Sequence, residues 1–199
     1  MINDKLKKAR EYEVRKEKEI APDKRPAFHL TPRVGWMNDP NGFSYHNGEY
    51  HLFYQYHPYD TNWGPMHWGH AVSKDLLKWE NRPTALAPDE RYDDFGCFSG
   101  SATTLDDGRQ ILMYTGVETA KDEEGKEIVF QTQCIAVGDG TNFEKYEKNP
   151  VITADDLPEG ASKIDFRDPK IWKEKDGTFR CVVGSRPEDE SGQILLYSS

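Results

Sequence analysis

The sequence is short of cysteine, long apolar runs and positive charge, and each shortage excludes a class of protein. Its 199 residues hold an odd number of cysteines, Cys97, Cys134 and Cys181, without Cys-x-x-Cys spacing, so neither a disulfide framework nor a zinc site is predicted. No stretch approaches the roughly 20 apolar residues of a membrane span, and the first twenty residues lack the apolar core of a secretion signal. Lysine and arginine number 26 against 35 acidic residues, a net charge of −9 that disfavours nucleic acid. We expect a cytoplasmic protein that binds neither nucleic acid nor membrane, and the sequence leaves its oligomeric state open.

Aromatic residues are plentiful although the chain is polar. Five Trp, ten Tyr and nine Phe accompany a mean hydropathy of −0.87, and a disordered chain would be short of such side chains. Together with 16 Gly and 12 Pro they indicate many short strands and turns around an aromatic core. The predicted fold class is therefore all-β.

The N-terminal segment has a different texture. Residues 1 to about 20 mix Lys, Arg and Glu with a few apolar residues and contain no Gly or Pro, which predicts one exposed or loosely docked helix. Pro22 and Pro26 end it. We therefore divide the chain into a charged helix and linker, residues 1–25, and a β-rich domain, residues 26–199.

An internal repeat runs through the β-rich domain. Gly48, Gly108 and Gly177 each close an Asn-Gly or Asp-Gly turn, lie 60 and 69 residues apart, and open a comparable strand. A unit of this length with about four strands is typical of a propeller blade, and propellers usually need four or more blades to close. The chain supplies about three, so we expect an incomplete propeller that ends within a blade. We also expect the sheet faces of its first and third repeats to be exposed to water.

The same register marks a candidate site. Equivalent positions in blades point to one shared axis, so residues far apart in sequence converge there. Counting back nine residues from each repeat glycine arrives at Asp39, Ser99 and Asp168. Two carboxylates in one polar funnel suit glycosyl transfer, in which one carboxylate attacks the anomeric carbon. The alternative reading is that Asn-Asp-Pro and Arg-Asp-Pro are Asx turns, with each Asp bonding its own backbone.

Several motifs resemble, in order, the signatures of glycoside hydrolase family 32. They are Trp36-Met37-Asn38-Asp39-Pro40-Asn41-Gly42, Phe53-Tyr54-Gln55, Trp63-Gly64-Pro65-Met66-His67-Trp68-Gly69-His70, Phe98-Ser99-Gly100-Ser101-Ala102, Tyr114-Thr115-Gly116 and Phe166-Arg167-Asp168-Pro169-Lys170. The segment His29–Trp36 is most similar to bacterial intracellular sucrose-6-phosphate hydrolases and sucrases, the β-fructofuranosidases. The resemblance implies a five-bladed propeller followed by a β-sandwich, of which this chain is an N-terminal fragment.

The resemblance also implies roles for particular residues. Asp39 would be the nucleophile that forms a fructosyl intermediate, and Asp168 would stabilise the oxocarbenium-like transition state. The implied pocket residues are Asn38, Gln55, Trp63, Phe98, Ser99 and Arg167. The implied reaction releases fructose from sucrose or sucrose 6-phosphate, with a small-molecule sugar as partner and no cofactor.

One catalytic group of the family has no match. The family's acid is the Glu of a Glu-Cys pair, whereas Gly96, Gln133 and Arg180 precede the three cysteines here. Glu188 and Glu190 lie in a charged cluster typical of a solvated hairpin tip, so the fragment is expected to be inactive by itself.

Other functions stay open or are weaker. A propeller fragment that binds sugar without cleaving it, and a fructan hydrolase of the same family, are the alternatives. His67 and His70 are weak candidates for metal ligands, because side chains three residues apart on an extended segment point to opposite faces. No metal site is predicted.

Overall fold

The described part of the chain folds into three antiparallel sheets and one α-helix. A computed structural model describes residues 3–121, 124–187 and 189–199. The helix is α1 (Asp4–Glu17), and single 3-10 turns lie at Pro22–Lys24, Arg91–Asp93 and Ala154–Asp156. The strands are β1 (Trp36–His46), β2 (Glu49–His57), β3 (His67–Ser73), β4 (Glu80–Leu86), β5 (Gly96–Thr104), β6 (Gln110–Lys121), β7 (Glu127–Gly138), β8 (Phe143–Lys145), β9 (Phe166–Lys173), β10 (Phe179–Ser185) and β11 (Gln193–Ser198). The predicted all-β class with a short N-terminal helix is confirmed.

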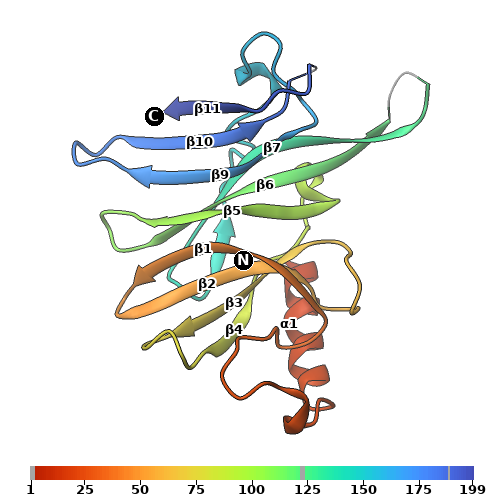
Figure 1. Cartoon of the computed structure of the whole chain (residues 1–199), viewed down its shortest axis with the longest axis vertical. Coiled ribbons are helices and arrows are strands. Elements are labelled where there is room, and N and C mark those ends of the chain that lie inside the picture. Colours follow the sequence, from red (N-terminus) through yellow and green to blue (C-terminus); the bar gives the residue numbers. More distant parts are fainter. Residues whose placement is uncertain (1–2, 122–123, 188) are drawn as a thin grey trace.

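Each sheet follows the chain. The first has the order β1-β2-β3-β4, the second β5-β6-β7-β8 and the third, within the described residues, β9-β10-β11. The repeat glycines close the first hairpin of each sheet with positive φ, 85° at Gly48, 82° at Gly108 and 93° at Gly177, a conformation that costs glycine nothing. The first strands β1, β5 and β9 are successive neighbours, and β1 and β5 lie side by side at the middle of the molecule (Figure 1).

Strand β6 shows how the sheets stack. Leu112 and Tyr114 pack into a core shared with the first sheet, whereas Ile111 and Met113 pack into a core shared with the third. Successive strand residues point to opposite faces, so a middle sheet buried on both faces needs an unbroken apolar run. Ile111-Leu112-Met113-Tyr114 is that run.

Helix α1 is docked, which corrects the expectation of an exposed or loosely held helix. Tyr54 and Tyr56 of β2 face away from the second sheet, and α1 with the segment after it covers them. Glu13 of α1 is only 1% exposed and accepts hydrogen bonds from Thr84 of β4. The outer face of the first sheet is therefore covered, which also corrects the expectation that the sheet face of the first repeat stays exposed to water.

No helix among the described residues is long and apolar enough to cross a membrane.

Candidate active site

Three equivalent β-bulges form the framework of the site. In each sheet the first strand carries one residue more than its neighbour, between Met37 and Pro40 in β1, between Phe98 and Gly100 in β5, and between Arg167 and Lys170 in β9. The bulged segments contain Asp39, Ser99 and Asp168. A bulge turns a side chain out of the regular alternation of the strand, so all three can point out of the sheets toward a common point.

Asp39 and Ser99 meet directly, although they lie on different sheets. The Ser99 hydroxyl donates a hydrogen bond to Oδ2 of Asp39 at 2.9 Å. The Asp39 side chain is exposed and Ser99 is half-buried. The predicted convergence of these two positions is confirmed, and the contact fixes the orientation of an accessible carboxylate.

The negative charge of Asp39 acts on the carboxyl group of Asp168. Partial desolvation raises the pKa of the Asp168 carboxyl, the Asp39 carboxylate raises it further, and Arg167 opposes the rise. Nε of Arg167 lies 3.9 Å from Oδ2 of Asp168, whose side chain is 61% exposed. The two aspartates therefore share one side of the molecule, as the repeat register predicts.

A cavity of about 330 Å³ opens beside Asp168. Two guanidinium groups line it, and both pair with Asp165: Arg186 Nη2 lies 2.7 Å from its carboxylate and Arg167 Nη1 lies 3.5 Å from it. Gly184 and Ser185 complete the lining. This cavity offers hydrogen-bond donors and acceptors to a polyhydroxyl ligand next to the carboxylate.

Trp63 and Phe98 form an aromatic wall near Ser99. The Trp63 ring is 49% exposed and meets the Phe98 ring edge-on, with centroids 6.1 Å apart. Phe95 packs against both rings. An exposed indole beside hydroxyl-binding groups suits the apolar C–H face of a sugar ring.

The side chains of Asn38 and Gln55 form hydrogen bonds with other residues of the chain. Oδ1 of Asn38 accepts from the Trp36 indole N–H at 2.7 Å. Gln55 is 3% exposed, and its amide donates to the Cys97 carbonyl at 2.9 Å, two residues before Ser99. The structure thus places Gln55 beneath the bulge of β5, and its role in binding sugar stays a prediction.

The charged turn near the C-terminus is only partly described. Glu188 lies outside the described residues. Glu190 is exposed, has a φ of 63°, and its backbone N–H donates to the Pro187 carbonyl at 2.9 Å. This turn geometry agrees with the solvated hairpin tip expected from the sequence.

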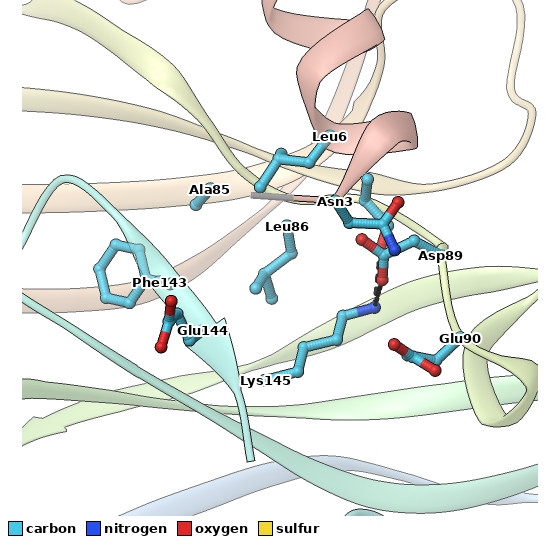
Figure 2. A pocket seen from close by; sticks show the side chains of 10 residues that line it. Asn3, Leu6, Ala85, Leu86, Asp89, Glu90, Phe143, Glu144 and Lys145 are labelled. Carbon is cyan, nitrogen blue, oxygen red and sulfur yellow. Dashed lines mark hydrogen bonds and ion pairs between the residues drawn. The ribbon is translucent and has the colours of Figure 1, made fainter. Parts of the chain in front are cut away.

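A second cavity, of about 230 Å³, lies between the start of α1, the end of β4 and β8 (Figure 2). Lys145 reaches into its lining and donates to the Ala87 carbonyl and to the carboxylates of Asp89 and Asp93. These three partners use all three ammonium protons. Lys145, Asp89 and Asp93 thus link β8 of the second sheet to the segment that follows β4 of the first. This cluster contains neither Asp39 nor Asp168.

Two buried residues behind the site were given no role by the sequence, although Thr115 lies in the Tyr114-Thr115-Gly116 motif. Thr115 and Gln133 are 0% exposed and connect the second sheet to the backbone around Asp168. The repeat register contained a signal for Thr115, because it follows Gly108 by seven residues just as Gln55 follows Gly48. Gln133 had no signal of its own, since its contact depends on how two sheets stack.

Comparison with known proteins agrees with this geometry. The family model described as "Glycosyl hydrolases family 32 N-terminal domain" matches residues 29–199. The chain is 50% identical over 173 residues to the raffinose invertase of Escherichia coli and 47% identical to a sucrose-6-phosphate hydrolase of Escherichia coli, in each case over 86% of this chain and 34% of the relative. It therefore spans about a third of the length of these curated relatives.

Solved structures give the same family. The GH32 β-fructofuranosidase of Bombyx mori superposes with a TM-score of 0.84 at 47% identity, covering 98% of this chain and 39% of the other. The sucrose-6-phosphate hydrolase of Lactobacillus gasseri gives a TM-score of 0.77 at 34% identity, over 95% and 37% of the two chains. With the family model matched over residues 29–199 and these similarities, the chain belongs to glycoside hydrolase family 32.

Proposed function

We propose that the chain supplies the nucleophile half of a retaining β-fructofuranosidase that releases fructose from sucrose or sucrose 6-phosphate. The observation that carries the proposal is that Asp39, Ser99 and Asp168 lie on three equivalent bulges, where Ser99 hydrogen-bonds to Asp39 and the Asp39 charge acts on Asp168. One relative is named a sucrose-6-phosphate hydrolase and another a raffinose invertase, and a mutant of the Bombyx mori GH32 β-fructofuranosidase is solved in complex with sucrose. Fructose is the shared part of both substrates.

The proposal gives each carboxylate a role. Asp39 is accessible and oriented by Ser99, so it attacks the anomeric carbon of fructose. The partial charge that develops on the ring is stabilised by Asp168, whose hydrogen bonds to fructose hydroxyls strengthen in the transition state. The pocket walls are supplied by Asn38, Gln55, Trp63, Phe98, Ser99 and Arg167.

The proposal extends to the architecture. The three sheets are the first three blades of a five-bladed propeller, in which residues 26–199 form part of the catalytic domain and residues 1–25 the helix and linker. The carboxylic acid that protonates the leaving oxygen is the Glu of a Glu-Cys pair, a pair that this sequence lacks. The three cysteines are buried and unpaired, which supports a reducing cytoplasmic location.

The test uses a hybrid enzyme in which this chain replaces the matched segment of the Escherichia coli raffinose invertase. Asp39→Ala should abolish glucose release from sucrose while the thermal unfolding temperature stays close to that of the parent. Asp23→Ala, at an exposed aspartate near α1, is the matched control and should keep full activity. Parent-level turnover by the Asp39 variant would refute the nucleophile role, and retained sugar binding without turnover in the parent hybrid would favour a binding module.

A further inference from the structure

A relay of buried side chains in the second sheet holds the backbone of Asp168. The Asp168 N–H donates to Thr115 Oγ1 at 3.1 Å, and the Thr115 hydroxyl donates to Gln133 Oε1 at 3.0 Å. The Gln133 amide then donates to the Phe166 carbonyl at 2.8 Å. Thr115 and Gln133 are both 0% exposed. The relay therefore starts and ends on β9, two residues apart, and passes through β6 and β7.

The backbone at Asp168 needs such support. Its φ is 62°, in the left-handed region that a residue with a Cβ rarely occupies because its Cβ lies too close to the backbone carbonyl oxygen. On the other side of the bulge, Ser101 donates to the Pro169 carbonyl at 2.7 Å and accepts from the Ile171 N–H at 2.9 Å. Hydroxyls of the second sheet thus bracket the bulge that aims the carboxylate.

The same device recurs between the first and second sheets. Gln55 and Trp68 are cross-strand partners on β2 and β3, as Thr115 and Gln133 are on β6 and β7. Gln55 donates to the Cys97 carbonyl, and the Trp68 indole donates to the Phe98 carbonyl at 3.0 Å. The two acceptors belong to the two residues before Ser99. Recurrence at the equivalent place indicates that each sheet shapes the bulge of the next.

We propose that Thr115 and Gln133 are positioning residues for Asp168, holding its backbone in the conformation that directs the carboxylate toward Asp39. This inference rests on the proposed function, in which Asp168 stabilises the transition state. Neither residue touches substrate, since both are buried beneath the bulge. Their effect is on the aim of a catalytic group.

Removing the Thr115 hydroxyl has a definite consequence. Valine has the shape of threonine without the hydroxyl, so Thr115→Val leaves the Asp168 N–H and Gln133 Oε1 without the partner they share. The bulge then relaxes toward ordinary extended backbone, and the carboxylate moves away from Asp39. Because a misplacement of about 1 Å costs about 10²-fold in rate, we expect kcat to fall about 10²-fold, with KM changing less than about threefold.

The experiment compares two buried glutamines. Gln133→Met breaks the relay. Gln110→Met removes an equally buried glutamine whose amide donates to Ser44 at 2.8 Å, between the first and second sheets. Both variants lose stability. Only Gln133→Met and Thr115→Val should lower kcat in the hybrid enzyme, and Thr115→Ser, which keeps the hydroxyl, should restore it.

A second readout needs no turnover. A carboxyl NMR titration of the 199-residue chain should show the raised pKa of Asp168 falling toward its ordinary value of 3.8 in Thr115→Val, as the carboxylate leaves Asp39 and the partly desolvated position. Gln110→Met should leave that pKa unchanged.

The outcomes separate the two proposals. If Asp168→Asn lowers kcat but folded Thr115→Val and Gln133→Met leave kcat and the Asp168 pKa unchanged, the positioning role is refuted and the proposed function stands. If Asp168→Asn itself leaves kcat unchanged, the proposed function fails. Should Thr115→Val not fold, Gln133→Met and Thr115→Ser decide the question. An equal loss of kcat in Gln110→Met would reduce both glutamines to structural residues.

Discussion

Helix α1 depends on one buried glutamate, so Glu13→Ala should be among the most destabilising single substitutions in this chain. Glu13 Oε1 accepts from the Thr84 N–H at 3.0 Å, and Oε2 accepts from the Thr84 hydroxyl at 2.7 Å. Arg33 Nη1 lies 3.7 Å from the same carboxylate. The side chain of Glu13 is almost completely buried, and Thr84 is 0% exposed. Alanine would leave the Thr84 N–H and hydroxyl without these partners at once, and would leave Arg33 with Glu17.

The magnitude follows from what is left behind. A buried hydrogen-bond donor that loses its acceptor costs about 1–3 kcal/mol, and Glu13→Ala leaves two such donors, the N–H and the hydroxyl of Thr84. The contributions overlap, so we expect Glu13→Ala to lower the free energy of unfolding by about 3–5 kcal/mol. At about 2–4 °C per kcal/mol for a chain of this size, Tm should fall by about 6–20 °C.

The charge of Glu13 matters less than its oxygens. Burial is the largest influence on this carboxyl and raises its pKa, against the opposing effects of Thr84 and Arg33. The folded state therefore does not favour the ionised form. Glutamine keeps an acceptor for the Thr84 N–H and offers an amide N–H to the Thr84 hydroxyl, so Glu13→Gln should cost about 1 kcal/mol.

Urea and thermal unfolding followed by circular dichroism test this ordering. Glu11→Ala, at an exposed position of the same helix, is the control and should change stability by less than about 0.5 kcal/mol. Hydrogen exchange of the α1 amides should accelerate only in Glu13→Ala. Equal losses in the Gln and Ala variants would show that the charge holds the helix, and a loss below about 1 kcal/mol in Glu13→Ala would mean that α1 is not docked in solution.

Three further predictions concern catalysis, pH and the isolated chain. Asp168→Asn in the hybrid enzyme should lower kcat by about 10²-fold or more, as measured by glucose release, while Asp23→Ala does not. Burial lowers the pKa of His70 well below 6.5 and also lowers that of His51, so the folded state binds fewer protons than the unfolded chain, and Tm should fall as the pH drops below about 6.5. His70→Gln should flatten that slope, an exposed His29→Gln control should not, and an unchanged slope in both would refute the assignment. The 199-residue chain alone should release no glucose from sucrose at a useful rate, whereas turnover comparable to the hybrid enzyme would indicate that another acid, such as Glu190, reaches the site.

Local pattern was enough to predict much of this protein. Turn dipeptides that each open a comparable strand predicted the repeated hairpins, because turn chemistry acts over a few residues. Once the repeat was recognised, a constant offset from Gly48, Gly108 and Gly177 placed Asp39, Ser99 and Asp168 at equivalent positions, and the structure finds a bulge at each. The family signatures added the chemistry expected at those positions.

The stacking of the sheets decided what the sequence could not. The relay of Thr115 and Gln133 links residues up to 53 apart, and the seat of Glu13 on Thr84 links residues 71 apart. A polar residue in an apolar strand, or an acid within a charged helix, is read locally as solvent-facing, because its partner lies on a strand whose register is set only when the cores form. The sequence alone therefore determined which residues could do chemistry and the order of the strands, whereas only the packing of one sheet against the next determined where those residues point.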